Sequence, residues 1–259
     1  MEKVAHITHL LRQALRSVTV KIFLIIVALV LPLNILAIIH ALNARESVTD
    51  QVKLSIDSIG KSVMATLDAR MERADYFIYD LRTNNADFIK ASKQEGNTYY
   101  TVSKIRLLNQ VYSQLQTVSA ADGYFFYMER AEEALISVND SYLVEKGTLT
   151  DYLKEASHRQ VQKKWTIVTI KDEQWLMRVT KYNGTTLGAL INLDQVIKEM
   201  TKSIQYKAHH ILVLPASEGY TSPKDQLTLA NTSTRGNLTL LIQIAKAEIN
   251  QGIKKKKKG

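Results

Sequence analysis

The eighteen residues IFLIIVALVLPLNILAII, at positions 22–39, carry no charged side chain. An apolar run of about this length can cross the roughly 30 Å hydrocarbon core of a bilayer as a helix. Pro32 is no obstacle, because neighbouring groups in a membrane helix can satisfy the backbone that proline leaves unpaired. We therefore expect a transmembrane helix over residues 22–41.

Four basic residues precede this run: Lys3, Arg12, Arg16 and Lys21. Basic residues are retained on the cytoplasmic side of a membrane, so residues 1–21 are expected to be a cytoplasmic N-terminus and the rest of the chain to lie outside. A cleaved signal peptide is the alternative. Its basic region would be unusually long, and its apolar run would exceed the usual length of about 7–15 residues, which favours the anchor.

The net charge of +9 is concentrated at the two ends of the chain. Residues 1–21 contribute +3 and the five lysines at 254–258 contribute +5, which leaves +1 for residues 22–253. A nearly neutral domain has no basic face, so we expect no nucleic-acid partner. Polybasic segments act on the cytoplasmic side of an anchor, and these lysines would lie outside, so we expect residues 254–259 to be foreign to the fold. The chain has no cysteine, and its domain must be held together by packing.

Apolar residues recur every three or four positions after the anchor, as in a long amphipathic helix. This pattern predicts a stalk helix over residues 42–82, which can continue the membrane helix as one rod. A second helix is predicted over 98–118. The stalk stripe is Val48, Val52, Ile56, Ile59, Val63, Leu67, Met71, Ala74, Ile78 and Leu81, and the packed side of the second helix is Val102, Ile105, Leu108, Tyr112 and Leu115.

Five stretches that follow have the composition of strands. They cover 124–128, 135–138, 165–170, 175–182 and 186–193, with a helical or looped crossover at 142–160. Asn183-Gly184 predicts a hairpin turn, because both residues accept positive φ. Asp194 is predicted to cap a helix over 195–205. The fold class is therefore α+β, with a five-stranded, mostly antiparallel sheet. Further strands at 211–214, 227–230 and 238–244 predict a second, smaller lobe.

This layout resembles the Cache family, specifically the double-Cache extracytoplasmic sensor domains of bacterial transmembrane receptors. The segment LGALINLDQVIKEM (187–200) is similar to the end of the membrane-distal lobe in that family. The arrangement is most similar to the sensor histidine kinases that are paired with AraC-type regulators in Gram-positive bacteria. The amino-acid-binding members carry an Arg-x-Trp-Tyr signature that we do not find here, so an amino-acid ligand is not supported.

The resemblance implies a PAS-like sheet in a distal Cache lobe at 83–205, a membrane-proximal lobe at 206–253, a small-molecule ligand and a homodimer. It also implies a two-component kinase whose response regulator is reached only through a kinase module. We expect that module and a second membrane helix to be missing from this chain. A chemoreceptor ectodomain and a surface adhesion or structural protein without a ligand remain alternatives.

No catalytic motif is found, so we expect no enzymatic activity in this chain, no cofactor and no metal site. The candidate ligand-binding residues are Arg178, Tyr127, Trp165 and Tyr182. An arginine in the middle of a central strand is uncommon unless it is paired or exposed, and it could hold a ligand carboxylate in bidentate fashion. The alternative is that Arg178 faces solvent and the aromatic residues belong to the core.

Overall fold

The computed structural model describes residues 18–93, 98–139, 152, 164–170, 172–204 and 210–249. The chain divides into two compact units, one formed by Met1–Val52 with Asn250–Gly259 and the other by Lys53–Ile249. Both sheets belong to the second unit, which carries the contacts discussed below. The lysine tail, residues 1–17 and the predicted crossover apart from Tyr152 lie outside the described residues.

Helix α2 (Val18–Asn84) is a single helix of 67 residues with Pro32 inside it. The predicted membrane helix and the predicted stalk helix are therefore continuous. Among the described residues, α2 is the one helix long and apolar enough to cross a membrane. None of its most apolar window is buried, and Leu29 and Leu33 are about two-thirds exposed, at 64% and 66%. Such a surface is unfavourable in water and suited to lipid.

The buried side of α2 follows the predicted stripe in its second half, where Leu67, Met71, Ala74, Ile78 and Leu81 are all buried. Nearer the N-terminus Val52 and Ile56 are also buried as predicted. Between Ile56 and Leu67 the buried line runs through Gly60 and Met64, and the predicted Ile59 and Val63 are only half-buried. The reason is the close approach of the smaller sheet. A Cβ at Gly60 would lie 2.5 Å from Asn231 Nδ2, so a larger residue there would displace the Asn231 side chain.

The larger sheet has five antiparallel strands in the order β2-β1-β5-β4-β3. They are β1 (Gly123–Met128), β2 (Glu133–Val138), β3 (Thr166–Ile170), β4 (Glu173–Tyr182) and β5 (Thr185–Asn192). All five predicted strands and the antiparallel sheet are thereby confirmed. The predicted turn between β4 and β5 is also present, with φ of 49° at Asn183 and 73° at Gly184.

Side chains alternate between the two faces of this sheet. On one face Tyr124 packs edge-on against Phe77 of α2, with ring centroids 4.8 Å apart. On the other face a separate apolar cluster contains Phe125, Trp175, Met177, Val179 and Leu190. The sheet therefore has a face directed at the helices and a second face with its own core.

Helix α3 (Ala86–Lys93) was not predicted from the sequence. Asn85 caps it: Asn85 Oδ1 accepts a hydrogen bond of 2.7 Å from the Phe88 amide. Phe88 is fully buried and lies 6.0 Å from the ring of Phe126. One aromatic side chain thus holds a short helix against the sheet.

Helix α4 (Thr98–Val118) has the predicted bounds, but its predicted packed side is wrong. The buried residues are Tyr100, Ser103, Leu107, Val111 and Leu115. Of the predicted set, Val102, Ile105 and Tyr112 are exposed and Leu108 is half-buried. The helix has a second apolar line through Leu107, Val111 and Leu115, and this is the one that is buried. On the same side, Tyr100 Oη and Lys104 Nζ both bond to the carboxylate of Glu133 in β2, at 2.7 and 2.8 Å.

Helix α6 (Leu193–Ser203) begins two residues earlier than predicted. Its N-cap is Asn192, whose Oδ1 accepts a hydrogen bond of 2.9 Å from the Gln195 amide. The prediction that Asp194 caps the helix is wrong. Asp194 lies in the first turn, and its carboxylate accepts from the amide of Gln174 at the start of β4. The side chain therefore joins the helix to a strand.

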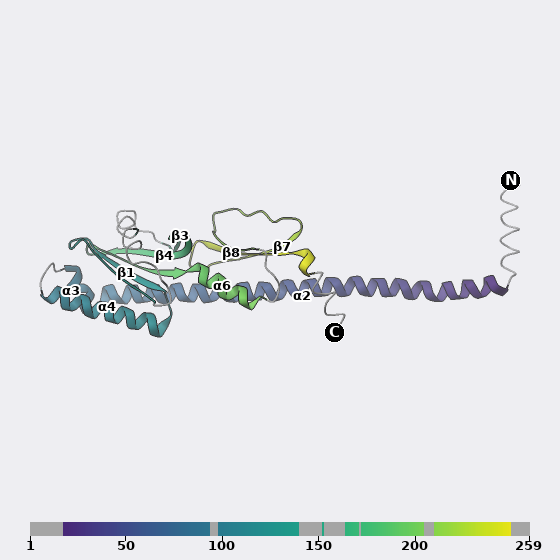
Figure 1. Cartoon of the computed structure of the whole chain (residues 1–259), viewed down its shortest axis with the longest axis horizontal. Helices are drawn as coiled ribbons and strands as arrows, with labels where there is room; N and C mark the ends of the chain where they lie inside the picture. Colours follow the sequence, from purple (N-terminus) through teal and green to yellow (C-terminus); the bar gives the residue numbers. More distant parts are fainter. Residues whose placement is uncertain are drawn as a thin grey trace. The chain divides into compact units, whose positions relative to one another are not determined.

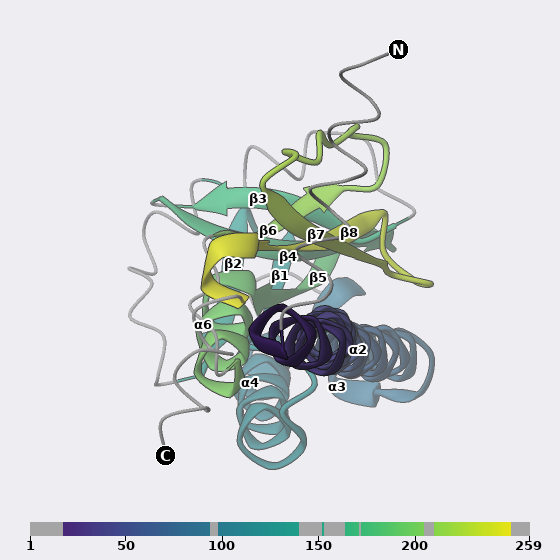
Figure 2. The ribbon, with the colours of Figure 1, turned by 90° about the vertical axis from the view of Figure 1, so that its right-hand side faces the viewer.

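The smaller sheet consists of β6 (His210–Pro215), β7 (Gln226–Thr232) and β8 (Leu238–Ala245), in the order β6-β8-β7. Its three strands confirm the predicted second group. Figure 1 shows the two sheets one after the other along α2, and Figure 2, which looks along α2, shows both on the same side of this helix. Helix α2 is thus the element that both sheets share.

Candidate functional site

Arg178 lies in the middle of β4, on the face directed at α2. Its Nε lies 3.2 Å from Asp75 Oδ1 of α2, and the arginine side chain is 22% exposed. The other oxygen of the same carboxylate accepts a hydrogen bond of 3.1 Å from Trp165 Nε1. The structure therefore brings two of the four predicted site residues together, on an aspartate that the sequence had not singled out.

The other two predicted residues lie elsewhere. Tyr182 shares the face of Arg178 but is directed at α3, with its ring 6.4 Å from that of Phe88. Tyr127 lies opposite Thr186 in the strand register, on the same face as Phe125. This is the face turned away from α2. The four residues consequently do not surround one cavity.

A second polar contact joins α2 to the start of β1. Arg70 Nη2 lies 2.9 Å from Asp122 Oδ1, and Asp122 is buried. The other oxygen of Asp122 accepts a hydrogen bond of 2.8 Å from the amide of Asn192, at the end of β5. Charge-assisted hydrogen bonds of this kind are among the stronger ones in proteins. One aspartate thus connects the helix with two central strands.

Two further contacts join α2 to the turn between β7 and β8. Asp68 accepts hydrogen bonds from the hydroxyls of Ser233 and Thr234 and from the Thr234 amide. One turn later, Glu72 pairs with Arg235. Burial raises the pKa of the Asp68 carboxyl, but the hydrogen bonds from Ser233 and Thr234 outweigh burial and hold this pKa below its usual value. The carboxylate is therefore stabilised in its charged form.

The polar residues at positions 68, 70, 72 and 75 thus connect α2 to both sheets, with Asp68, Glu72 and Asp75 on one side of the buried stripe and Arg70 on the other; we call these four residues the polar contact residues. The apolar stripe alone does not point to these four residues. No local pattern marks these residues, because every amphipathic helix has polar residues beside its apolar stripe. Their partners lie more than fifty positions away in the sequence.

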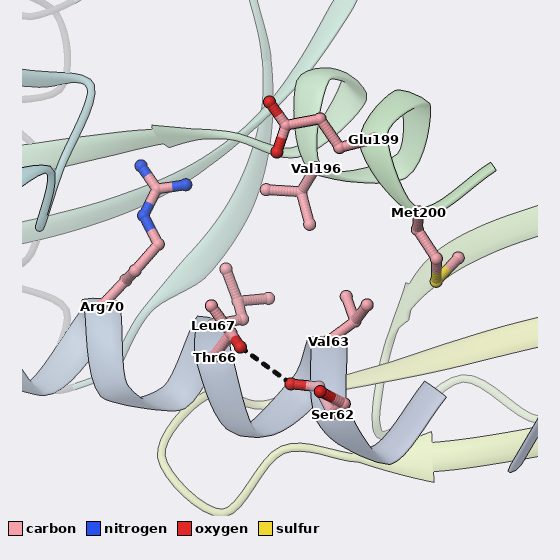
Figure 3. A pocket seen from close by; sticks show the side chains of 8 residues that line it. All are labelled: Ser62, Val63, Thr66, Leu67, Arg70, Val196, Glu199 and Met200. Carbon is pink, nitrogen blue, oxygen red and sulfur yellow. Dashed lines mark hydrogen bonds between the residues drawn. The ribbon is translucent and has the colours of Figure 1, made fainter. Parts of the chain in front are cut away.

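A small pocket lies between α2 and α6 (Figure 3). Its volume is about 190 Å³, and Val63, Leu67, Val196 and Met200 supply its apolar wall. Figure 3 shows the charged ends of Arg70 and Glu199 at its edge. Sites for drug-sized molecules usually measure about 300–1,000 Å³, so this pocket is smaller than a typical site of that kind.

A larger depression, of about 430 Å³, lies between α2, β4 and the turn between β7 and β8. Arg178 and Thr180 line it from β4, and Arg235 lines it from the turn. Of the predicted ligand-binding residues, Arg178 is the one that reaches this depression. In the described part of the chain, no three His, Asp or Glu side chains gather in a way that could hold a metal ion.

No protein-family model matches this chain, and no curated protein matches it. Among solved structures, it is similar to the LuxQ periplasmic domain of Vibrio cholerae, with 15% identity and a TM-score of 0.43, covering 75% of this chain and 98% of that one. It is similar to the extracellular domain of the putative histidine kinase vpHK1S-Z8, with 10% identity and a TM-score of 0.46, covering 80% and 96%. The sensory domain of the Campylobacter jejuni chemoreceptor Tlp3 also matches, with 9% identity and a TM-score of 0.37, covering 78% and 98%.

Proposed function

We propose that this chain is the sensory part of a membrane receptor. Residues 22–41 cross the membrane with the N-terminus in the cytoplasm, and the unit Lys53–Ile249 lies outside and recognises a small molecule. One observation carries the proposal: α2 contains an exposed apolar stretch of membrane-spanning length and also the buried stripe on which both sheets pack. Because the same helix forms the membrane anchor and the support of both sheets, a change in the folded unit can be passed through α2 to the membrane.

The strand order supports the same proposal. The order β2-β1-β5-β4-β3 is PAS-like, as the resemblance to the Cache family implied. The segment 187–200, which carried that resemblance, forms β5 and α6, and its Gly188 is tightly enclosed. A Cβ there would lie 2.0 Å from the carbonyl oxygen of Arg178, so glycine is required for the strands to pair.

The polar contact residues provide the route for the signal. Asp75 and Arg70 connect α2 to the larger sheet, and Asp68 and Glu72 connect it to the smaller one. A ligand that favours one arrangement of the sheets shifts the population towards the α2 position that fits that arrangement. Because α2 is continuous, a small displacement or rotation of its distal half reaches the membrane segment.

The output is the finer part of the proposal. We assign the chain to a two-component sensor histidine kinase that works as a homodimer, and we assign no catalytic step to the chain itself. A chemoreceptor output is the alternative with the same ectodomain. The coding sequence downstream of residue 253 discriminates between them: a kinase module supports our assignment, and a chemotaxis signalling module replaces it.

The sensory role is tested by thermal unfolding of the full chain in lipid nanodiscs. The panel contains organic acids, amines, sugars, amino acids and nucleosides at millimolar concentration. A ligand present at 100 times its Kd stabilises the folded state by about 2.7 kcal/mol. We expect at least one class of compound to raise the unfolding temperature in proportion to the logarithm of its concentration. A panel with no effect would favour the structural or adhesion protein.

A further inference from the structure

The depression beside Arg178 has the volume of a small-molecule site, at about 430 Å³. Its walls come from three parts of the fold: α2, β4 and the turn between β7 and β8. Helix α2 already contacts each of the other two walls, β4 through the pair Arg178–Asp75 and the turn through the pair Arg235–Glu72. A molecule bound here would touch α2 and both sheets at once.

The charges in this depression do not balance. It is lined by three arginines and two carboxylates, so one positive charge is left over. Asp75 pairs with Arg178 and Glu72 pairs with Arg235. The third arginine, Arg82, makes no ion pair with any residue that the structure describes, and its guanidinium lies over the ring of Tyr79, 5.0 Å from the centroid. The excess charge is therefore centred on Arg82.

Aromatic surface lies next to this charge. Tyr76 and Tyr79 both line the depression, and they are 71% and 52% exposed. They stand on one side of α2 with Arg82, since residues three and four apart are neighbours on a helix. An exposed tyrosine offers a flat apolar face and a hydroxyl that can bond to a ligand. The site thus combines one uncompensated guanidinium with two accessible rings.

We propose that this depression binds a small aromatic monocarboxylic acid. Its carboxylate accepts hydrogen bonds from Arg82, in the bidentate geometry that guanidinium favours, and its ring packs against Tyr76 and Tyr79. The single negative charge of a carboxylate balances the one unpaired positive charge of the depression, whereas a phosphate monoester carries nearly two negative charges. This inference rests on the proposed function, because it names the ligand class and the place of recognition.

The test uses the full chain in nanodiscs and isothermal titration with benzoate and phenylacetate. Benzamide, cyclohexanecarboxylate and inorganic phosphate are the matched probes. We expect benzoate or phenylacetate to bind, with benzamide weaker by about tenfold or more, because a charge-assisted hydrogen bond is lost. Cyclohexanecarboxylate, which keeps the charge and lacks the ring, should bind more weakly than benzoate. Stronger binding of phosphate than of either aromatic acid would overturn the proposal.

Two variants locate the binding. Arg82→Gln should weaken binding of the aromatic acid by about tenfold or more, with little change in unfolding temperature. Arg73→Gln is the control, since Arg73 is exposed on the same helix and its Nε bonds to the carbonyl of Ala69. Binding that survives Arg82→Gln, or a full titration series without binding, rejects this site. Rejection of this site would leave the proposed sensory role standing. That role fails only if the broad panel of compounds also gives no stabilisation.

Discussion

Asp75 and Arg178 are 103 positions apart in the sequence, and their side chains form an ion pair of 3.2 Å between α2 and β4. The same aspartate accepts a hydrogen bond from the buried Trp165. Asp75 is thus the point at which α2 holds the strand that carries Arg178. Substituting Asp75 removes both contacts and substituting Arg178 removes one, so the two substitutions together measure how strongly α2 holds this strand.

Removal of Asp75 should be more costly than removal of Arg178. Asp75→Ala leaves the indole N–H of buried Trp165 without this acceptor, and an unsatisfied buried group costs roughly 1–3 kcal/mol. Arg178→Ala keeps that hydrogen bond and should cost about 1 kcal/mol, as expected for a partly exposed pair. Urea unfolding of the full chain in detergent gives both values. The control is Asp57→Ala, whose ion pair with Lys61 lies within α2 and contributes only about 0.3–0.5 kcal/mol. Equal losses for all three variants would show that Asp75 does not hold the sheet.

Gly188 should tolerate no side chain. Gly188→Ala would place a Cβ 2.0 Å from a backbone oxygen and 2.4 Å from the ring of Phe125, so the strands would have to separate. We expect a loss of about 3 kcal/mol or more in unfolding free energy. Gly219→Ala is the matched control, because nothing lies within 4 Å of the added atom, and its effect should be small. A Gly188→Ala protein as stable as the control would mean that β4 and β5 do not pair in this register.

The contact of Asp68 with the smaller sheet should be sensitive to acid. Its pKa in the folded state is lower than in the unfolded chain, so the carboxylate contributes stability above the unfolded value of 3.8 and loses it as the pH falls through the folded value. Asp68→Asn should therefore reduce the loss of unfolding free energy between pH 5 and pH 3. Ser233→Ala removes one of the hydrogen bonds and should give an intermediate slope. Denaturant unfolding at several pH values measures both, and an unchanged slope in Asp68→Asn would contradict this account.

The helical phase of α2 should matter for signalling. Gly60 is enclosed by Asn231 and Ile242, so an insertion there would disturb the fold. After the exposed Glu46 an insertion leaves the unit Lys53–Ile249 intact. Four added residues rotate the two halves of the helix by about 40° relative to each other, and seven by about 20° in the opposite direction. In the complete receptor, four residues should lock or invert the output while ligand binding persists, and seven should act more mildly. A passive spacer would tolerate both insertions.

Much of this fold could be predicted because its signals are local. The period of α2, the Asn183-Gly184 turn and the alternation within the strands each depend on neighbouring residues. The packed side of α4 could not be predicted, because the helix carries apolar residues on two sides and only its packing on other elements decides which side is buried. Asn192 and Asp194 both suit a helix cap, and only the position of Gln174 decides between them.

The candidate site was less accessible to sequence reasoning. An arginine in a central strand needs a partner unless it is exposed, and this property distinguishes Arg178 in the sequence. Its partner Asp75 lies in a helix whose polar residues gave no distinct local pattern. Tyr127 was grouped with Arg178 on composition, although strand alternation places the two on opposite faces. Arg82 and Tyr79 became candidates only when their place in the depression was known.

The position of the folded unit relative to the membrane is the central claim, and thiol labelling of intact cells tests it most directly. The chain has no cysteine, so each single substitution is the sole labelling site. Ser113 is exposed on α4, and Ser17 lies in the basic N-terminal segment. We predict that Ser113→Cys reacts with a membrane-impermeant maleimide on intact cells, and that Ser17→Cys reacts only after permeabilisation. Labelling of Ser17→Cys on intact cells, with Ser113→Cys protected, would contradict the account.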